Sequence, residues 1–234
     1  MPLLFSDPSH VALLESSRDP ISEDHARQAL TRPIGHKGAQ LIDLVTSDMQ
    51  RIAELGPGFG QHLQRLHDKD PGRELLGIEI SPEIAFVANK ISSFPYLLAE
   101  AEHIPIPDET FDMVFSVAAF SHFQDINAVI SEMRRILKSD GKALIITENP
   151  LFIAYRIQFI FGKWSGFSSK MGRHFVNSMA TMKEWITIFR DHGFELEKNL
   201  SNIVRIRENK KSLYLGSNFG NLLAKHFAFC FAKK

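Results

Sequence analysis

A stretch with a glycine at every second position constrains most strongly what this chain can fold into. Residues 51–60 read RIAELGPGFG, so a mostly apolar run leads through an acid, Glu54, to Gly56, Gly58 and Gly60. Without Cβ atoms, a backbone can turn tightly between a strand and a helix and approach a bound ligand closely. The stretch therefore predicts a strand, a glycine turn and a helix, in that order.

The residues after the glycines separate several kinds of ligand. A phosphate-binding P-loop ends in Gly-Lys-Ser or Gly-Lys-Thr, whereas Gly60 is followed by Gln61 and His62. A dinucleotide-binding turn has its third glycine where this chain has Gln61. Two interpretations remain at this point: a turn for a ligand without phosphate, and a plain turn between a strand and a helix.

Strand-like and helix-like segments alternate through the middle of the chain, which predicts a parallel sheet with crossover helices. Strands are expected at 51–55, 75–80, 95–99, 113–117 and 142–147. Helices are expected at 61–67, after a Ser81 cap, and from an Asp125 cap through Leu137 to a stop at 139–141.

The two ends of the chain follow other patterns. The first 45 residues predict two helices broken at 32–33, with no strand. A capping box from Thr181 to Glu184 predicts a helix that ends near 192–193, and strand-like stretches follow near 194–207 and 227–232.

Composition is typical of a globular protein with a sizeable core. The chain has 234 residues, of which 44% are hydrophobic, and Lys+Arg and Asp+Glu both number 27, so no net charge attracts it to nucleic acid. Cys230 is the single cysteine, which excludes an intrachain disulfide and favours a reducing cytosol. The first ten residues do not read as a signal peptide, and the longest apolar stretch, 151–162, is far shorter than the roughly 20 residues of a membrane span. A soluble, cytoplasmic protein is expected.

Further acids follow the glycine turn at informative places. Glu79 stands at the end of the next predicted strand, where a carboxylate can accept hydrogen bonds from both hydroxyls of a ribose. Residues 98–108 read LAEAEHIPIPD, and Phe111-Asp112 follow.

Together these motifs resemble those of the class I S-adenosylmethionine-dependent methyltransferases, and most closely the small-molecule branch that includes quinone-biosynthesis enzymes. Residues 132–142, EMRRILKSDGK, are similar to the family's passage from a helix into the fifth strand. The resemblance covers about residues 50–148, with a weaker echo in 181–194. It implies a Rossmann-like α/β sheet of about seven strands with helices on both faces, an N-terminal helical cover and a lid inserted after the fifth strand.

The resemblance also implies one domain in four parts. These are an N-terminal cover (1–48), a cofactor-binding core (49–148), a lid for the substrate (149–180), and a C-terminal helix with the last strands (181–234).

The resemblance further implies the cofactor, S-adenosylmethionine with S-adenosylhomocysteine as product, and a role for each residue that matches a motif. The glycine turn passes beside the methionine moiety, Glu54 orients its ammonium, Glu79 holds the ribose and Ile80 packs on the adenine. Glu100 stands where the family usually has Asp, so its contact with the adenine amino group competes with the interpretation as a solvated loop carboxylate. The cofactor residues implied in full are Glu54, Gly56, Pro57, Gly58, Gly60, Glu79, Ile80, Glu100, Ala101 and Ser116.

No catalytic residue follows from the motifs, because methyl transfer from a sulfonium depends chiefly on placing the acceptor. His122, just past the fourth strand, either orients or deprotonates a hydroxyl, or is merely held between Phe120 and Phe123. No metal site is expected.

The segment after the fifth strand predicts the acceptor's character. From 149 to 183 there are many aromatic residues and no acid. Three interpretations stay open: a pocket for an amphiphilic, anionic acceptor, a basic surface that touches a membrane, and an ordinary helical lid. The substrate candidates are His122, Tyr155, Arg156, Trp164 and Arg173.

The sequence therefore predicts methyl transfer to a small, partly apolar acceptor. The rival interpretation is a non-catalytic, cofactor-binding or partner-binding subunit, and a nicotinamide dehydrogenase is a third option. Nothing in the sequence favours nucleic acid as a partner, since the basic residues of 205–211 are typical of a solvated hairpin. The oligomeric state does not follow from the sequence.

Overall fold

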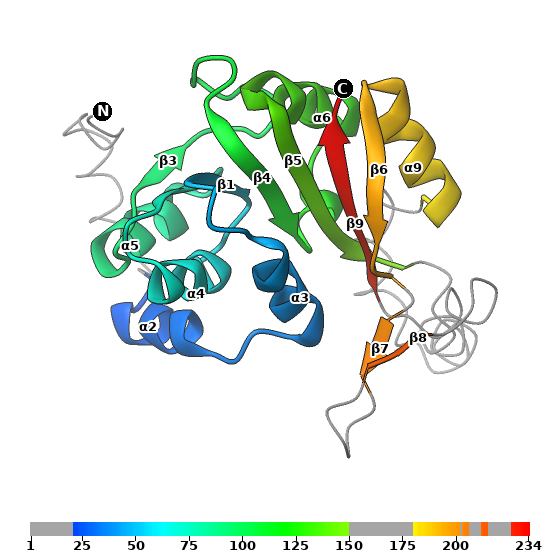
Figure 1. Ribbon diagram of the computed structural model, residues 1–234. Coiled ribbons are helices and arrows are strands. Elements are labelled where there is room, and N and C mark those ends of the chain that lie inside the picture. Colours follow the sequence, from blue (N-terminus) through cyan, green and yellow to red (C-terminus); the bar gives the residue numbers. More distant parts are fainter. Residues whose placement is uncertain (1–20, 150–179, 202, 206–211, 215–225) are drawn as a thin grey trace, which may run out of the picture.

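The fold is a seven-stranded sheet with helices on both faces (Figure 1). The computed structural model describes residues 21–149, 180–201, 203–205, 212–214 and 226–234. The strands of this sheet are β1 (Arg51–Leu55), β2 (Glu74–Glu79), β3 (Tyr96–Leu98), β4 (Phe111–Val117), β5 (Leu137–Glu148), β6 (Phe194–Asn199) and β9 (His226–Lys233). The helices are α2 (Glu23–Thr31), α3 (His36–Leu44), α4 (Gln61–Lys69), α5 (Pro82–Ile91), η1 (Phe120–His122, a 3-10 turn), α6 (Ile126–Ile136) and α9 (Met182–Asp191).

The strand order is β3-β2-β1-β4-β5-β9-β6. The first five strands in this order run parallel, and β9 runs antiparallel to both of its neighbours. This confirms the expected α/β sheet of about seven strands. Two short strands, β7 (Ile203–Arg205) and β8 (Ser212–Tyr214), form a separate antiparallel pair that projects away from the main sheet (Figure 1).

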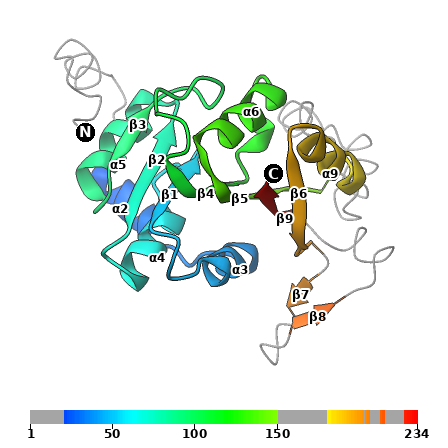
Figure 2. The same cartoon turned by 45° about the horizontal axis from the view of Figure 1, so that its top comes forward.

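Each face of the sheet is covered by its own group of helices (Figure 2). Apolar residues of α3, α4 and α5 form one buried cluster against the sheet, and those of α6 and α9 form another on the opposite face. The N-terminal α2 packs on α4 and α5, and α3 packs on α4. The expected N-terminal helices therefore lie over one face of the sheet.

Several helices begin at the capping residues that the sequence predicted. The Ser81 hydroxyl accepts a hydrogen bond from the Ile84 amide, and one oxygen of Asp125 accepts from two amides of α6. Thr181 and Glu184 form the expected reciprocal capping box at the start of α9. These side chains satisfy amides that a helix leaves unbonded in its first turn.

Two predicted boundaries were wrong. No loop separates α6 from the fifth strand, because β5 begins at Leu137, directly after the helix. The residues of β5 that pair with β4 jump from Leu137 to Lys142, so the expected stop at 139–141 is a bulge within β5. The strand-like stretch 194–207 is divided between β6 of the main sheet and β7 of the separate pair.

The lid predicted at 149–180 lies outside the described residues, apart from its two end positions. Among the residues that the structure describes, no helix has the length and apolar character needed to cross a bilayer.

Candidate functional site

The strand order reverses between β1 and β4: β2 and β3 follow on one side of β1, and β5 follows on the far side of β4. Such a switch point places a ligand-binding crevice at the carboxyl ends of β1 and β4. Gly56 follows β1 and Ala118 follows β4, and their φ angles are 65° and 57°. A Cβ on Gly56 would come within 2.6 Å of the Cβ of Ala119, so the two turns meet too closely for a side chain at position 56. A left-handed alanine is uncommon, and such backbone strain gathers at functional sites.

The middle of the glycine turn is held from two neighbouring strands. The Gly58 amide donates to Glu79 Oε2 at 3.1 Å, and the Gly58 carbonyl accepts from the hydroxyl of the buried Tyr96 at 3.1 Å. At Gly60, with φ 82°, an added Cβ would lie 2.3 Å from that hydroxyl, whereas nothing lies within 4 Å of an added Cβ on Gly58. The turn is thus fixed on its inner side and open on the other.

Glu79 is fixed by backbone amides before any ligand arrives. Its Oε1 accepts from the amides of Ile80 and Ser81, both at 3.0 Å, and its Oε2 accepts from Gly58. A carboxylate has about four acceptor sites, so capacity for a further donor remains, mainly on Oε2. Beside it, Ile80 is 59% exposed and is the large hydrophobic side chain that the described part of the chain leaves open to solvent.

Glu54 forms a buried pair that the sequence did not predict. The side chain of Glu54, on β1, is 1% exposed, and its Oε1 lies 3.0 Å from Nδ1 of His62 in the first turn of α4. Its Oε2 is buried and has no hydrogen-bond partner among the residues that the structure describes. Burial, opposed by His62, raises the pKa of the Glu54 carboxyl. Burial acts to lower the pKa of the His62 imidazole, but Glu54 outweighs it and the net pKa is raised. Both shifts favour retention of a proton on the pair.

The other predicted cofactor residues lie around the same crevice in different environments. Ser116 is fully buried, and its hydroxyl donates to the Leu55 carbonyl at 2.9 Å, which ties β4 to β1. Ala101 is buried in the turn after β3, and the neighbouring Glu100 is exposed, 3.8 Å from Nδ1 of His103. Pro57 is buried between the first two glycines.

The rim where an acceptor is expected contains one predicted residue and one that was not predicted. His122 is exposed in η1, directly after β4. Glu148 ends β5 opposite His226 of β9, and one of its carboxylate oxygens is buried without a partner. An acid at the end of a predicted strand was the available signal, as at Glu79. The candidates Tyr155, Arg156, Trp164 and Arg173 lie outside the described residues.

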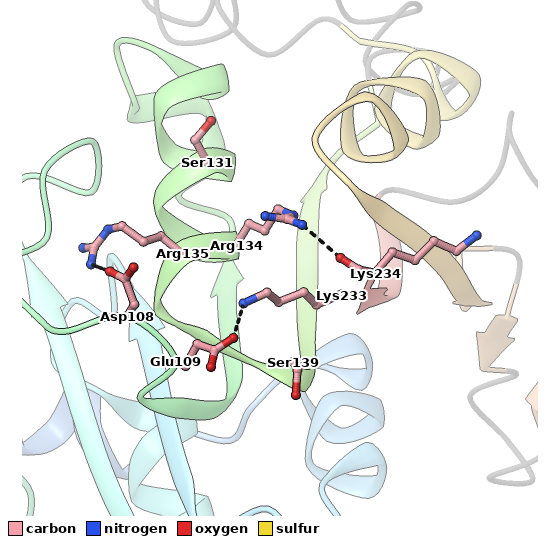
Figure 3. Close-up of a pocket in the computed structure, with 8 residues that line it drawn as sticks. All are labelled: Asp108, Glu109, Ser131, Arg134, Arg135, Ser139, Lys233 and Lys234. Atoms are coloured by element: carbon pink, nitrogen blue, oxygen red, sulfur yellow. Dashed lines mark hydrogen bonds and ion pairs between the residues drawn. The ribbon is translucent and has the colours of Figure 1, made fainter.

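A cavity of about 650 Å³ lies at the opposite edge of the sheet, near the amino ends of β4 and β5 (Figure 3). Two ion pairs lie in its wall: Arg135 lies 2.7 Å from Asp108, and Lys233 lies 3.5 Å from Glu109. The cavity is lined by Asp108, Glu109, Ser131, Arg134, Arg135, Ser139, Lys233 and Lys234. None of the predicted site residues that the structure describes lines it.

Comparison with known proteins decides the family. Residues 53–145 match the family described as "Methyltransferase domain". The matched region, residues 53–145, is a methyltransferase domain, and the relatives support the class I, S-adenosylmethionine-dependent type. The chain is 23% identical over 173 residues to a demethylmenaquinone methyltransferase of Thermotoga maritima, covering 67% of this chain and 76% of that protein.

Two further similarities extend the comparison. A malonyl-[acyl-carrier protein] O-methyltransferase of Hamiltonella defensa is 33% identical over 113 residues, covering 47% of this chain and 43% of that protein. A solved structure of a SAM-dependent methyltransferase of Thermotoga maritima superposes with a TM-score of 0.62 at 21% identity, covering 85% of this chain and 88% of that chain. The chain thus spans less than half of one curated relative and about three quarters of the other.

Methyltransferases of this family use S-adenosylmethionine as methyl donor, and the described residues fit it. The open side of Gly58 leaves room for a ligand against the backbone, Glu79 retains acceptor capacity, and Ile80 offers an exposed apolar surface for a base. The unpartnered oxygen of Glu54 is a buried acceptor in need of a donor, which an ammonium group supplies. The cofactor supplies an electrophilic methyl group on a positively charged sulfur.

Proposed function

We propose that the protein transfers the methyl group of S-adenosylmethionine to a small, partly apolar acceptor by in-line displacement. The observation that carries the proposal is the glycine turn, which Glu79 and Tyr96 hold at Gly58 while its other side stays open. In this proposal residues 49–148 bind the cofactor and 149–180 cover the acceptor.

The chain's own part in the reaction is to place the acceptor and exclude water. Displacement at a sulfonium methyl group needs the nucleophile in line at about 3–3.5 Å, and the sulfur loses its charge as the bond breaks. We assign to His122, directly after β4, and to Glu148, at the end of β5, the task of orienting an acceptor hydroxyl or amine and of taking its proton when the acceptor arrives protonated.

The names of the relatives suggest which acceptors to test. They are named as enzymes that act on demethylmenaquinone and on malonyl-[acyl-carrier protein]. An amphiphilic acceptor would agree with the aromatic, acid-free segment that follows β5.

The first experiment is calorimetric titration of the protein with S-adenosylmethionine, S-adenosylhomocysteine and NAD in parallel. We expect micromolar binding of the first two and no binding of NAD. Silence from the two sulfur compounds would contradict the cofactor assignment, and binding of NAD alone would favour a dehydrogenase.

A second experiment separates an enzyme from a cofactor-binding subunit. The protein is incubated with methyl-labelled S-adenosylmethionine and a panel of quinols, phenols, amines and fatty acids, and S-adenosylhomocysteine is quantified. Production that depends on one acceptor class supports transfer. Tight binding without turnover across the panel favours the non-catalytic alternative.

A further inference from the structure

The buried Glu54–His62 pair sits at the base of the glycine turn. Glu54 precedes the turn on β1 and His62 follows it on α4, so one hydrogen bond of 3.0 Å joins the two elements that the glycines connect. His62 is 7% exposed, and the edge of its ring meets the ring of Phe115 on β4 at 6.5 Å between centroids. The pair is therefore a built part of the crevice.

Among the described residues, the groups around the pair include no second cation that acts on Glu54. On β2, the Glu79 carboxylate repels the charge of Glu54. On β3, the Tyr96 hydroxyl donates its hydrogen bond to the Gly58 carbonyl and not to Glu54. On α3, the backbone of Gly38 comes close, because a Cβ on Gly38 would lie 2.8 Å from Nε2 of His62. Among the described residues, His62 is thus the cation that acts on Glu54, and it engages one of the two oxygens.

The free oxygen and the held oxygen give the two residues different tasks. An ionised carboxylate can only accept, so with Glu54 ionised the contact has His62 Nδ1 as donor and Oε1 as acceptor. This contact fixes the orientation of the carboxylate, while Oε2 keeps its acceptor capacity. A buried acceptor without a donor is costly, so the site gains most from a ligand that brings a charged donor.

We propose that His62 is a positioning residue that aims Glu54 Oε2 at the α-ammonium of S-adenosylmethionine, and that arrival of this ammonium expels the proton held by the pair. This inference rests on the proposed function. On binding, the new cation and the imidazolium face one carboxylate, so the imidazolium loses its Nε2 proton to solvent and keeps Nδ1–H on Glu54. Because a proton is released, affinity for the cofactor rises with pH while the pair is protonated.

The test is calorimetry in two buffers of different ionisation enthalpy, with S-adenosylhomocysteine as the probe because it carries the same ammonium without the sulfonium. We expect the wild type to release up to about one proton per ligand bound near neutral pH. Methylthioadenosine has the adenosine part but no ammonium, and should release none.

Two substitutions separate positioning from packing. His62→Asn keeps a donor near the place of Nδ1 but does not titrate, so binding should stay within about threefold while proton release and pH dependence disappear. His62→Leu removes the donor and should weaken binding roughly 10- to 100-fold, the loss expected for a hydrogen bond to a charged group. His67→Asn, on the same helix but outside the crevice, is the matched control and should change neither quantity.

Each remaining outcome has a definite meaning. Proton release that persists in His62→Asn would overturn the role of His62, and so would equal affinities of the Asn and Leu variants. Thermal melting of each variant shows whether a loss of binding follows from loss of the fold, and His62→Asn with a wild-type melting temperature suffices for the test. Failure of the wild type to bind S-adenosylhomocysteine would overturn the proposed function as well as this inference.

Discussion

Polar residues are arranged differently at the two ends of the parallel strands, which we call the amino edge and the carboxyl edge of the sheet. At the amino edge, Arg135 is bonded to Glu132, to Asp108 and to the carbonyls of Ile104 and Ile106. At the carboxyl edge, Glu54 has an oxygen with no partner, and Glu79 is held by amides that leave acceptor capacity. At the amino edge the polar groups bond to one another, whereas at the carboxyl edge they are held in place but keep unused acceptors.

This difference shows that the presence of a cavity does not by itself indicate a binding site. The cavity of about 650 Å³ belongs to the amino edge, where cations and anions already satisfy one another (Figure 3). A binding site needs polar groups that are fixed in place yet retain unused donors or acceptors. That combination is found at the carboxyl edge, so substitutions at the two edges should affect different properties.

The largest effect is expected within the glycine turn. Gly60→Ala forces a side chain into a left-handed conformation and against the Tyr96 hydroxyl, and should lower the free energy of unfolding by about 3 kcal/mol. Gly58→Ala meets open space, and should cost about 1 kcal/mol of stability while abolishing cofactor binding. Urea unfolding and calorimetry measure the two quantities. Equal destabilisation by both substitutions would show that the turn is not open at Gly58.

The next effect concerns the two ends of β2. Glu79→Ala should weaken cofactor binding by about 1–3 kcal/mol, because hydrogen bonds to a carboxylate are lost and the Gly58 amide loses its acceptor. Glu74→Ala, at the other end of the strand, removes an exposed ion pair with Arg51 and should leave affinity unchanged. Unchanged affinity in Glu79→Ala would contradict the ribose role of Glu79.

At the amino edge, the comparison predicts a change in stability without a change in binding. Arg135→Met removes the donor to two carbonyls and two carboxylates and should lower the free energy of unfolding by about 1–2 kcal/mol, discounted because the side chain is partly exposed. Affinity for S-adenosylhomocysteine should stay within twofold. A large loss of affinity would show that the edges are coupled.

The smallest effect is a dependence of stability on pH. Burial acts to raise the pKa of Asp112, but the Lys138 ammonium and the amides of Arg51 and Gln50 outweigh it and lower that pKa. A carboxyl whose pKa is lower in the folded state stabilises the fold above its unfolded pKa of about 4, and the stabilisation is lost as the pH falls through the folded value. In unfolding experiments, Asp112→Asn should reduce by about 1 kcal/mol the free energy of unfolding that the protein loses on acidification. An equal loss in the wild type and the variant would contradict this.

Local features of the sequence predicted the fold well. Turn glycines, helix caps and strand runs act over a few residues, so β1, the glycine turn, α4 and the caps at Ser81, Asp125 and Thr181 could be placed from sequence alone. The bulge at 139–141 could not, because Ser-Asp-Gly is also typical of a helix stop, and only pairing with β4 distinguishes the two.

The sequence motifs marked candidate residues in the glycine turn and at the strand ends, but not those that depend on packing between distant elements. The Tyr96 hydroxyl reaches Gly58 from another strand, and His62 reaches Glu54 across the turn; neither residue belongs to a motif. Glu148 was missed although, like Glu79, it stands at the end of a strand; the feature that distinguishes it, a buried oxygen without a partner among the described residues, is visible only in the structure.

The position of β9 has a consequence for the order in which the protein matures during synthesis. Residues 226–233 insert between β5 and β6, and β6 has no other neighbour in the sheet. On the ribosome, the parallel half from β1 to β5 emerges first, and domains form from the N-terminal side as the chain lengthens. The segment that holds α9 and β6 must wait for β9, so its pairing is delayed until after residue 233 has emerged. Until then, the side of β5 that β9 will occupy is an unpaired edge, the point at which the nascent chain is most exposed to aggregation.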